Sequence, residues 1–121
     1  MKITNLKNIP EHLEYNWGKL DELSEYDLDG LKSFEIDEIW YYYVFGSYEG
    51  SGKLILRKGS LYDLHDMGHC SCYGPIDKYI IFNGLPFEDL IKSLSKELYD
   101  ECKLLFDKCL VANRKIKLEK L

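Results

Sequence analysis

Two histidines and two cysteines fall within eight consecutive positions near the middle of the chain. They are His65, His69, Cys70 and Cys72, and Asp66 lies among them. Thiolate sulfur and imidazole nitrogen are the ligands that zinc prefers in proteins, and a cysteine beside a histidine can also supply a nucleophile and its base. We therefore look for chemistry first in this Cys/His cluster, between residues 65 and 72.

Four side chains of the Cys/His cluster make a candidate ligand set for a structural zinc ion: His65, His69, Cys70 and Cys72, with Asp66 as a substitute. The ligand types suit zinc better than the spacing does. Zinc sites usually separate two cysteines by about two to four residues, whereas a single residue separates these two. Adjacent side chains on extended backbone point to opposite faces, so His69 and Cys70 can share one ion only where the chain turns.

Other interpretations of the cysteines stay open. An all-thiolate site would add Cys102 and Cys109 to Cys70 and Cys72, but the added pair is seven residues apart, about 10 Å along a helix. Small buried hydrophobes are the plainer interpretation of that pair. Catalysis by Cys70 or Cys72 with a histidine base would need a substrate pocket and an oxyanion-stabilising element. The plainest interpretation of the cluster is a set of buried or turn-forming residues without metal.

Length and hydropathy bound the class of protein. The chain has 121 residues, which suits one domain with a single core, so we expect one domain over residues 1–121. Its longest apolar run, residues 39–45, is too short for a membrane span or the core of a signal peptide. We expect a soluble, cytoplasmic protein with reduced cysteines and no membrane contact.

Negative charge is concentrated in the first half of the chain. Residues 1–52 carry 4 Lys and 11 Asp plus Glu, which gives this half a net charge of −7. The net charge of the whole chain is −5. Direct nucleic-acid binding is not expected, because phosphate contacts need cations. An ordinary solvated face is the plainer interpretation; the sharper one is a partner-binding surface that imitates a phosphate backbone. The carboxylates of this acidic stretch are Asp21, Glu22, Glu25, Asp27, Asp29, Glu35, Asp37 and Glu38.

The order of the elements predicts an α+β fold. Loosely periodic leucines over residues 9–31 predict one or two short N-terminal helices. The β-branched and aromatic run 39–45 predicts a central strand covered on both faces, and residues 53–57 and 61–67 continue it as an antiparallel meander. Residues 78–82 predict a fourth strand, ended by Asn83-Gly84. The expected sheet is therefore three- to four-stranded and antiparallel.

An apolar stripe follows the last predicted strand. It predicts one long C-terminal helix packed on one face of the sheet, with Pro86 in its first turn and acidic Glu88 and Asp89 at its positive end. The stripe consists of Phe87, Leu90, Ile91, Leu94, Leu98, Cys102, Leu105, Phe106, Cys109 and Leu110.

Two short segments carry a resemblance to a known group. Gly-Ser-Tyr-Glu-Gly at 46–50, followed by Gly-His-Cys-Ser-Cys-Tyr-Gly-Pro at 68–75, resembles a pattern in small uncharacterised proteins encoded by bacteriophages and prophages. The resemblance covers some thirty of the 121 residues. It implies a mobile-element setting, in the cytoplasm of a host cell, and brings no catalytic residue with it.

Together these features favour a binding protein over an enzyme. We expect a small non-enzymatic phage-type protein that binds and modulates a host protein, for example by inhibiting a defence nuclease through an acidic surface. The alternatives are a small zinc-binding module built on the Cys/His cluster, and a cysteine-dependent hydrolase or transferase.

Overall fold

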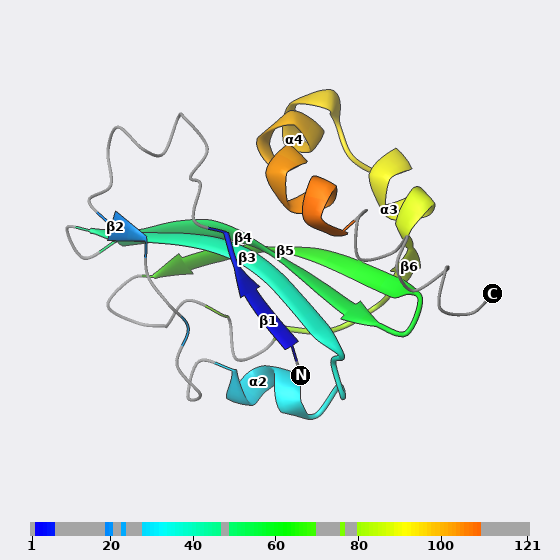
Figure 1. Cartoon of the computed structure of the whole chain (residues 1–121), viewed down its shortest axis with the longest axis horizontal. Coiled ribbons are helices and arrows are strands. Elements are labelled where there is room, and N and C mark those ends of the chain that lie inside the picture. Colours follow the sequence, from blue (N-terminus) through cyan, green and yellow to red (C-terminus); the bar gives the residue numbers. More distant parts are fainter. Residues whose placement is uncertain are drawn as a thin grey trace.

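The computed structural model describes residues 2–6, 19–20, 23, 28–46, 49–69, 76 and 80–109. These residues form a curved, mixed sheet with short helices above and below it, so the class is α+β, as predicted (Figure 1). The order of the main strands across the sheet is β1-β3-β4-β5-β6, and β2 also pairs with β3.

The centre of the sheet is the predicted antiparallel meander. It consists of β3 (Glu38–Gly46), β4 (Glu49–Lys58) and β5 (Leu61–His69), each longer than the sequence predicts. β4 pairs with β3 over residues 49–57 on one side and with β5 over residues 50–58 on the other. Because the three strands are neighbours in sequence, their pairing needs only short connections, which is why local patterns were enough to predict it.

The prediction of a strictly antiparallel sheet is wrong at the outer edge of β3. β1 (Lys2–Asn5) pairs in parallel with the first half of β3, and β2 (Lys19–Leu20) pairs antiparallel near its other end. Strands of four and two residues carry too little periodicity to be recognised, and here the unpaired edge of β3 supplies their partner. The prediction of helix over residues 9–31 is wrong at residues 19–20, which form β2, because pairing with β3 overrides the loose leucine spacing. A short helix, α2 (Asp29–Lys32), lies at the end of the predicted range, and most of residues 9–27 lie outside the described residues.

From Ile39 to Tyr43, β3 is buried on both faces, as predicted, because its successive side chains enter two different cores. The core under the C-terminal helices, called the α3/α4 core, contains Leu6, Trp40, Tyr42, Ile55, Tyr62, Leu90, Cys102, Leu105, Phe106 and Cys109. The core on the opposite face, called the α2 core, contains Leu28, Leu31, Ile36, Ile39, Tyr41, Tyr43, Leu54, Leu56, Met67 and Ile76.

The predicted fourth strand at 78–82 is not present in its described part. Residues 80–84 have no regular structure, and β6 (Leu85–Pro86) is a two-residue strand that pairs only with Leu61 and Tyr62 of β5. The reason is tertiary: the buried carboxylate of Asp63 accepts hydrogen bonds from the backbone amides of residues 83 and 84. The chain therefore leaves the sheet at this point instead of continuing along β5.

The prediction of one long C-terminal helix is also wrong. The structure has α3 (Phe87–Lys92), α4 (Lys96–Glu101) and a further helical stretch over residues 103–109. These three pieces lie on one face of the sheet, as the apolar stripe predicts, but they change direction between α3 and α4 (Figure 1).

Two serines account for the break between α3 and α4. The hydroxyl of Ser93 donates to the carbonyl of Leu90 at 2.6 Å, and the hydroxyl of Ser95 caps α4 by accepting the amide of Leu98 at 3.2 Å. Serine competes for backbone groups in this way and favours helix ends over helix interiors. The spacing of the leucines continues across the breaks between the helices. For this reason the sequence predicts one continuous helix where the structure has three pieces.

Candidate functional site

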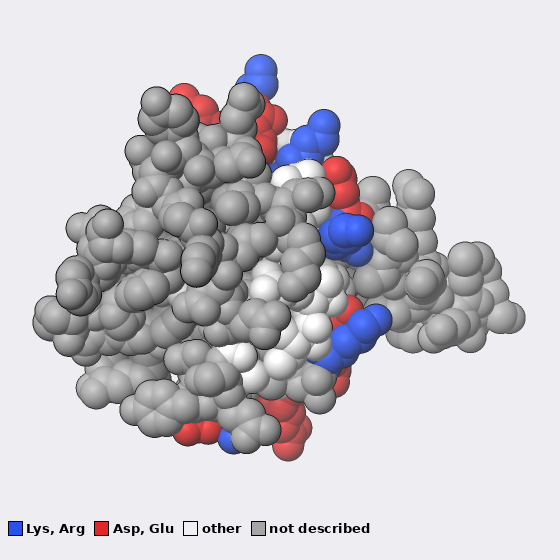
Figure 2. All heavy atoms as spheres, turned by 60° about the vertical axis from the view of Figure 1, so that its left-hand side comes forward, with Lys and Arg blue, Asp and Glu red and all other residues white. Residues whose placement is uncertain are grey.

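Half of the acidic stretch falls on described residues. Asp29 pairs with Lys32 at 2.9 Å, Glu35 is exposed, and Asp37 is half-exposed and accepts the amide of Gly59 at 2.7 Å. On the face drawn in Figure 2, the acidic side chains of the described residues alternate with lysines and arginines and form no single patch. Outside the described residues lie Asp21, Glu22, Glu25 and Asp27.

Glu38 does not belong to a surface. Its side chain is 8% exposed, and its carboxylate lies 3.4 Å from Nη2 of Arg57, the residue opposite it on β4. Lys2 on β1 approaches the same carboxylate at 4.0 Å. The residue therefore ties three neighbouring strands together and cannot contact a partner. The sequence places Glu38 in the acidic stretch because it precedes the predicted strand, residues 39–45. In the structure, β3 begins at Glu38 itself, so this side chain belongs to the sheet.

Of the four predicted zinc ligands, the structure describes the backbone position of only His65 and His69. His65 lies in the middle of β5 and His69 at its end, while Cys70 and Cys72 lie outside the described residues. Nε2 of His65 is 3.5 Å from Oδ2 of Asp63, on the same strand. Within the described ranges, no three His, Cys, Asp or Glu side chains are grouped as a metal site requires. Zinc binding by the cluster stays a prediction.

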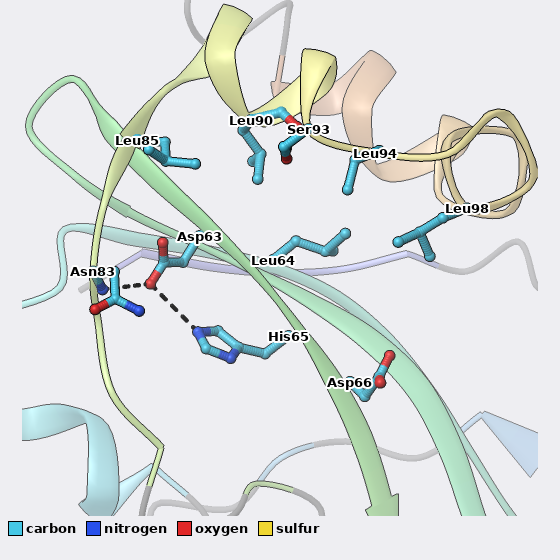
Figure 3. A pocket seen from close by; sticks show the side chains of 10 residues that line it. All are labelled: Asp63, Leu64, His65, Asp66, Asn83, Leu85, Leu90, Ser93, Leu94 and Leu98. Carbon is cyan, nitrogen blue, oxygen red and sulfur yellow. Dashed lines mark hydrogen bonds and ion pairs between the residues drawn. The ribbon is translucent and has the colours of Figure 1, made fainter.

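A cavity of about 410 Å³ opens beside β5, and we call it the β5 groove (Figure 3). Its walls come from β5, from the segment before β6, and from α3, α4 and the residues between them. Half of the lining side chains are leucines, and none of the lining residues is Lys or Arg. The lining residues are Asp63, Leu64, His65, Asp66, Asn83, Leu85, Leu90, Ser93, Leu94 and Leu98.

The groove follows an incompletely paired strand edge. β5 pairs with β4 over its whole length, but on its other side the described residues pair only with Leu61 and Tyr62. From residue 63 to residue 69, that second edge has no backbone partner among the described residues. An unpaired strand edge presents a row of amides and carbonyls that can take up another chain.

Asp63 fixes one wall of the groove. Its side chain is 10% exposed, and its two oxygens accept the amides of Asn83 at 2.7 Å and Gly84 at 2.8 Å. Figure 3 draws the contact with Asn83. A buried carboxylate needs such partners, because desolvation without them is costly. His65 adds a contact on the same oxygen that accepts the Asn83 amide. The carboxylate is thus occupied by structure and is not free to act as a general base.

Lys53 contacts Asp66, which lines the groove, but is not itself among the lining residues. It lies opposite Asp66 in the β4–β5 pairing, its ammonium contacts that carboxylate, and Oε1 of Glu101 on α4 is 3.9 Å away. Burial lowers the pKa of Lys53, but the hydrogen bond and charge of Asp66, with the charge of Glu101, hold it above its ordinary value of 10.5. The lysine therefore stays charged and links the sheet to α4.

The two described thiols lie in the α3/α4 core and face no solvent. Cys102 and Cys109 are both fully buried, and burial raises the pKa of Cys102 to about 11 and that of Cys109 further. Nucleophilic cysteines have depressed pKa values, because the thiolate is the reactive form. The interpretation of this pair as small buried hydrophobes is confirmed.

Sequence reasoning missed the β5 groove. The apolar stripe predicts that Leu90, Leu94 and Leu98 pack in the core, yet each of them also lines the groove. The one available hint was Asp63, a charged residue within an otherwise apolar strand pattern at Leu61–Leu64. A buried charged residue usually has a hydrogen-bond partner. The sequence does not show that the partner of Asp63 is the backbone of residues 83 and 84.

Comparison with known proteins adds no relative. No protein-family model, no curated protein and no solved structure matches the chain. In the part of the chain that the structure describes, no helix combines the length and the apolar character that a membrane span needs. The groove and its neighbouring residues are therefore the basis for a functional assignment.

Proposed function

We propose that this chain is a small non-enzymatic protein that binds another protein and modulates it. The observation that carries the proposal is the β5 groove, in which leucine side chains lie beside an incompletely paired strand edge. Concave apolar surfaces with a few polar groups are the usual places for ligands, and open strand edges are the usual places for peptide segments.

The groups near the groove support binding more than catalysis. Asp63 accepts two backbone amides, Lys53 contacts two carboxylates, and the nearest described thiol, Cys102, is buried with a raised pKa. Acid–base or nucleophilic catalysis needs a group free to exchange a proton or attack a substrate. A binding role needs only that these groups hold the walls in place.

Charge points to a basic partner. The groove contains Asp63 and Asp66 and no cationic lining residue, and the chain as a whole carries a net charge of −5. Such a surface attracts cationic partners and speeds their association. The resemblance to phage-encoded proteins suggests that the partner is a host protein. A defence nuclease is one such partner, because the acidic stretch would fit its basic substrate groove.

A second candidate function is zinc binding by the Cys/His cluster. The observation in its favour is that His65 and His69 share one strand, which leads directly into Cys70 and Cys72. Zinc analysis of protein purified without chelators tests it. Fewer than about 0.1 zinc ions per chain would contradict a structural site, because such sites hold their metal tightly.

Capture of a partner from host lysate by the immobilised full-length chain tests the main proposal. We expect stoichiometric retention of a discrete basic protein, reduced about tenfold or more when Asp21, Glu22, Glu25 and Asp27 are changed to Lys. The matched control changes the same number of exposed carboxylates, Glu88, Glu97, Asp100 and Asp107, and should retain most of the capture. Absence of any stoichiometric partner for the wild-type chain would contradict the proposal.

A further inference from the structure

We propose that the β5 groove binds an extended segment of a partner protein as an added strand, with an apolar side chain against Leu64 and a Lys or Arg against Asp66. The inference rests on the proposed protein-binding function and names the segment and the mode of recognition. Three features of the described residues carry it: the strand edge, the leucine wall and the position of the carboxylates.

Among the described residues, the edge of β5 beyond Tyr62 has no backbone partner, because Asp63 diverts the chain at residues 83 and 84. Leu61 pairs with Pro86 and Tyr62 with Leu85, so the next antiparallel pairs would join residue 63 to Gly84 and residue 64 to Asn83. Instead, both of those amides donate to the Asp63 carboxylate. The backbone of β5 beyond Tyr62 therefore lacks a described neighbour, in the position that an added strand would occupy.

The leucine wall lies on one face of that edge. Leu64 projects from β5 toward the α3/α4 core, and Leu90, Leu94 and Leu98 approach it from the helices (Figure 3). Leu85 adds a side chain that is 39% exposed. In an added strand, alternate side chains would point to this wall, and each apolar one would remove leucine surface from water.

The position of Asp66 sets the charge pattern of the segment. Asp66 lies two residues after Leu64, hence on the same face of β5, and its side chain is 81% exposed although it contacts Lys53. A basic side chain two positions from the apolar one would face this carboxylate. Opposite charges directly across paired strands are favourable, and like charges are unfavourable. The segment should thus have an apolar and a basic residue two positions apart. Their order along the segment depends on whether it pairs parallel or antiparallel to β5.

A second copy of this chain fits the same edge poorly. Pairing of β5 with β5 would bring the acidic rim of one copy, Asp63 and Asp66, against the same rim of the other. Among the described residues that line the groove, none is a Lys or Arg that could offset this repulsion. Charge complementarity therefore favours a basic partner over self-association.

Fluorescence anisotropy with synthetic peptides tests the inference. The probe is fluorescein-labelled, end-capped Val-Thr-Leu-Thr-Lys-Thr-Val, which carries an apolar and a basic residue two positions apart. We expect saturable binding to the full-length protein, weakened about tenfold or more when the peptide lysine becomes glutamate. N-methylation should weaken binding to a similar extent at the alternate residues whose amides face β5, and much less at the intervening residues, because only the former amides join a strand ladder.

Protein variants locate the site. Leu94→Asp and Asp66→Asn should each weaken binding of the lysine peptide, and Asp66→Asn should also reduce the discrimination between the lysine and glutamate peptides to a few-fold. Leu104→Asp is the control, because Leu104 is an exposed leucine, at 38%, that is not among the residues lining the groove, whereas Leu94 is partly buried and lines it. Circular dichroism of each variant checks that it is folded, and amide chemical shifts of residues 63–69 report contact at the strand edge.

Each outcome decides the inference. Equal binding of the lysine, glutamate and N-methylated peptides, or equal loss with Leu104→Asp, would overturn it, and so would a dimer in sedimentation that forms through residues 63–69. Capture of a partner that Leu94→Asp and Asp66→Asn leave unchanged would overturn the inference but leave the proposed function standing. Specific peptide binding that is lost in both groove variants supports the inference.

Discussion

The Asp63 carboxylate accepts the backbone amide of Gly84 at 2.8 Å and so holds a turn of the chain away from the sheet. The same carboxylate accepts the amide of Asn83. One side chain on β5 thus replaces the backbone ladder that would otherwise have continued at this edge. The shape of the β5 groove depends on this contact, because the chain would fill the groove if it followed the strand.

Replacing Asp63 tests how much stability this contact contributes. Asp63→Ala leaves two backbone amides without their acceptor, and we expect the free energy of unfolding to fall by about 2–4 kcal/mol. Asp63→Asn keeps one acceptor oxygen and should lose less. Urea unfolding measures both, with Asp29→Ala as the exposed control, expected within about 0.5 kcal/mol of wild type. An Asp63→Ala protein as stable as wild type would contradict the role assigned here.

Gly52 and Gly59 should respond differently to alanine. A Cβ on Gly52 would collide with the backbone carbonyl of Tyr42, which cannot move without breaking the pairing of β3 and β4. We expect Gly52→Ala to cost about 3 kcal/mol or more, or to prevent folding. Gly59 has open space around it but a φ of +61°, so Gly59→Ala should cost only about 1 kcal/mol. Thermal unfolding of the two variants checks this order, and the reverse order would refute it.

Stability should fall as the pH rises above about 9. Burial raises the pKa of Cys102 from 9.0 to about 11 and that of Cys109 further, so the folded state keeps protons that the unfolded state has lost. Above the unfolded pKa, each thiol then reduces the free energy of unfolding by up to about 1.4 kcal/mol per pH unit, and below it the contribution is fully present.

Urea unfolding between about pH 7.5 and pH 10 measures this slope, below the range where unfolded tyrosine and lysine mainly titrate. Cys102→Ala should have a shallower slope than wild type, although it is less stable throughout because it leaves a small cavity. Identical slopes for the two proteins would show that Cys102 does not ionise on unfolding in this range.

The buried thiols should also be protected from alkylation. In a Cys70→Ser/Cys72→Ser background, only Cys102 and Cys109 remain, and both are fully buried. We expect iodoacetamide at neutral pH to modify them at a rate limited by unfolding, and rapidly in urea. Mass spectrometry counts the adducts. Rapid modification of the folded protein would reopen a nucleophilic role for these residues.

Local patterns were sufficient for the centre of the fold. Alternation and β-branched residues predicted β3, β4 and β5, and the apolar run from Ile39 to Phe45 predicted burial on both faces. The errors arose where a distant residue decides the outcome. Asp63 ends the sheet at the 83–84 turn, and β1 finds its place only because β3 has an unpaired edge. No local pattern near residues 83–84 or 2–5 contains that information.

The candidate site was predicted only in part. The Cys/His cluster drew attention to the end of β5, and His65 does line the groove, but its nearest charged partner is Asp63 and not one of the predicted ligands. Leu94 and Leu98 could not be recognised as groove residues, because a leucine in an apolar stripe looks the same in the sequence whether it faces a filled core or a cavity. Only the position of the neighbouring strand distinguishes the two.

The parallel pairing of β1 with β3 has a consequence for the order of events during synthesis. β1 is synthesised before β3 and β4, but its partner positions start at Glu38 and β3 itself pairs with β4. A parallel partner so far along the chain involves a long loop closure, whereas the hairpins form between neighbours. We therefore expect β1 to dock on a meander that is already assembled, although β1 is synthesised before the meander.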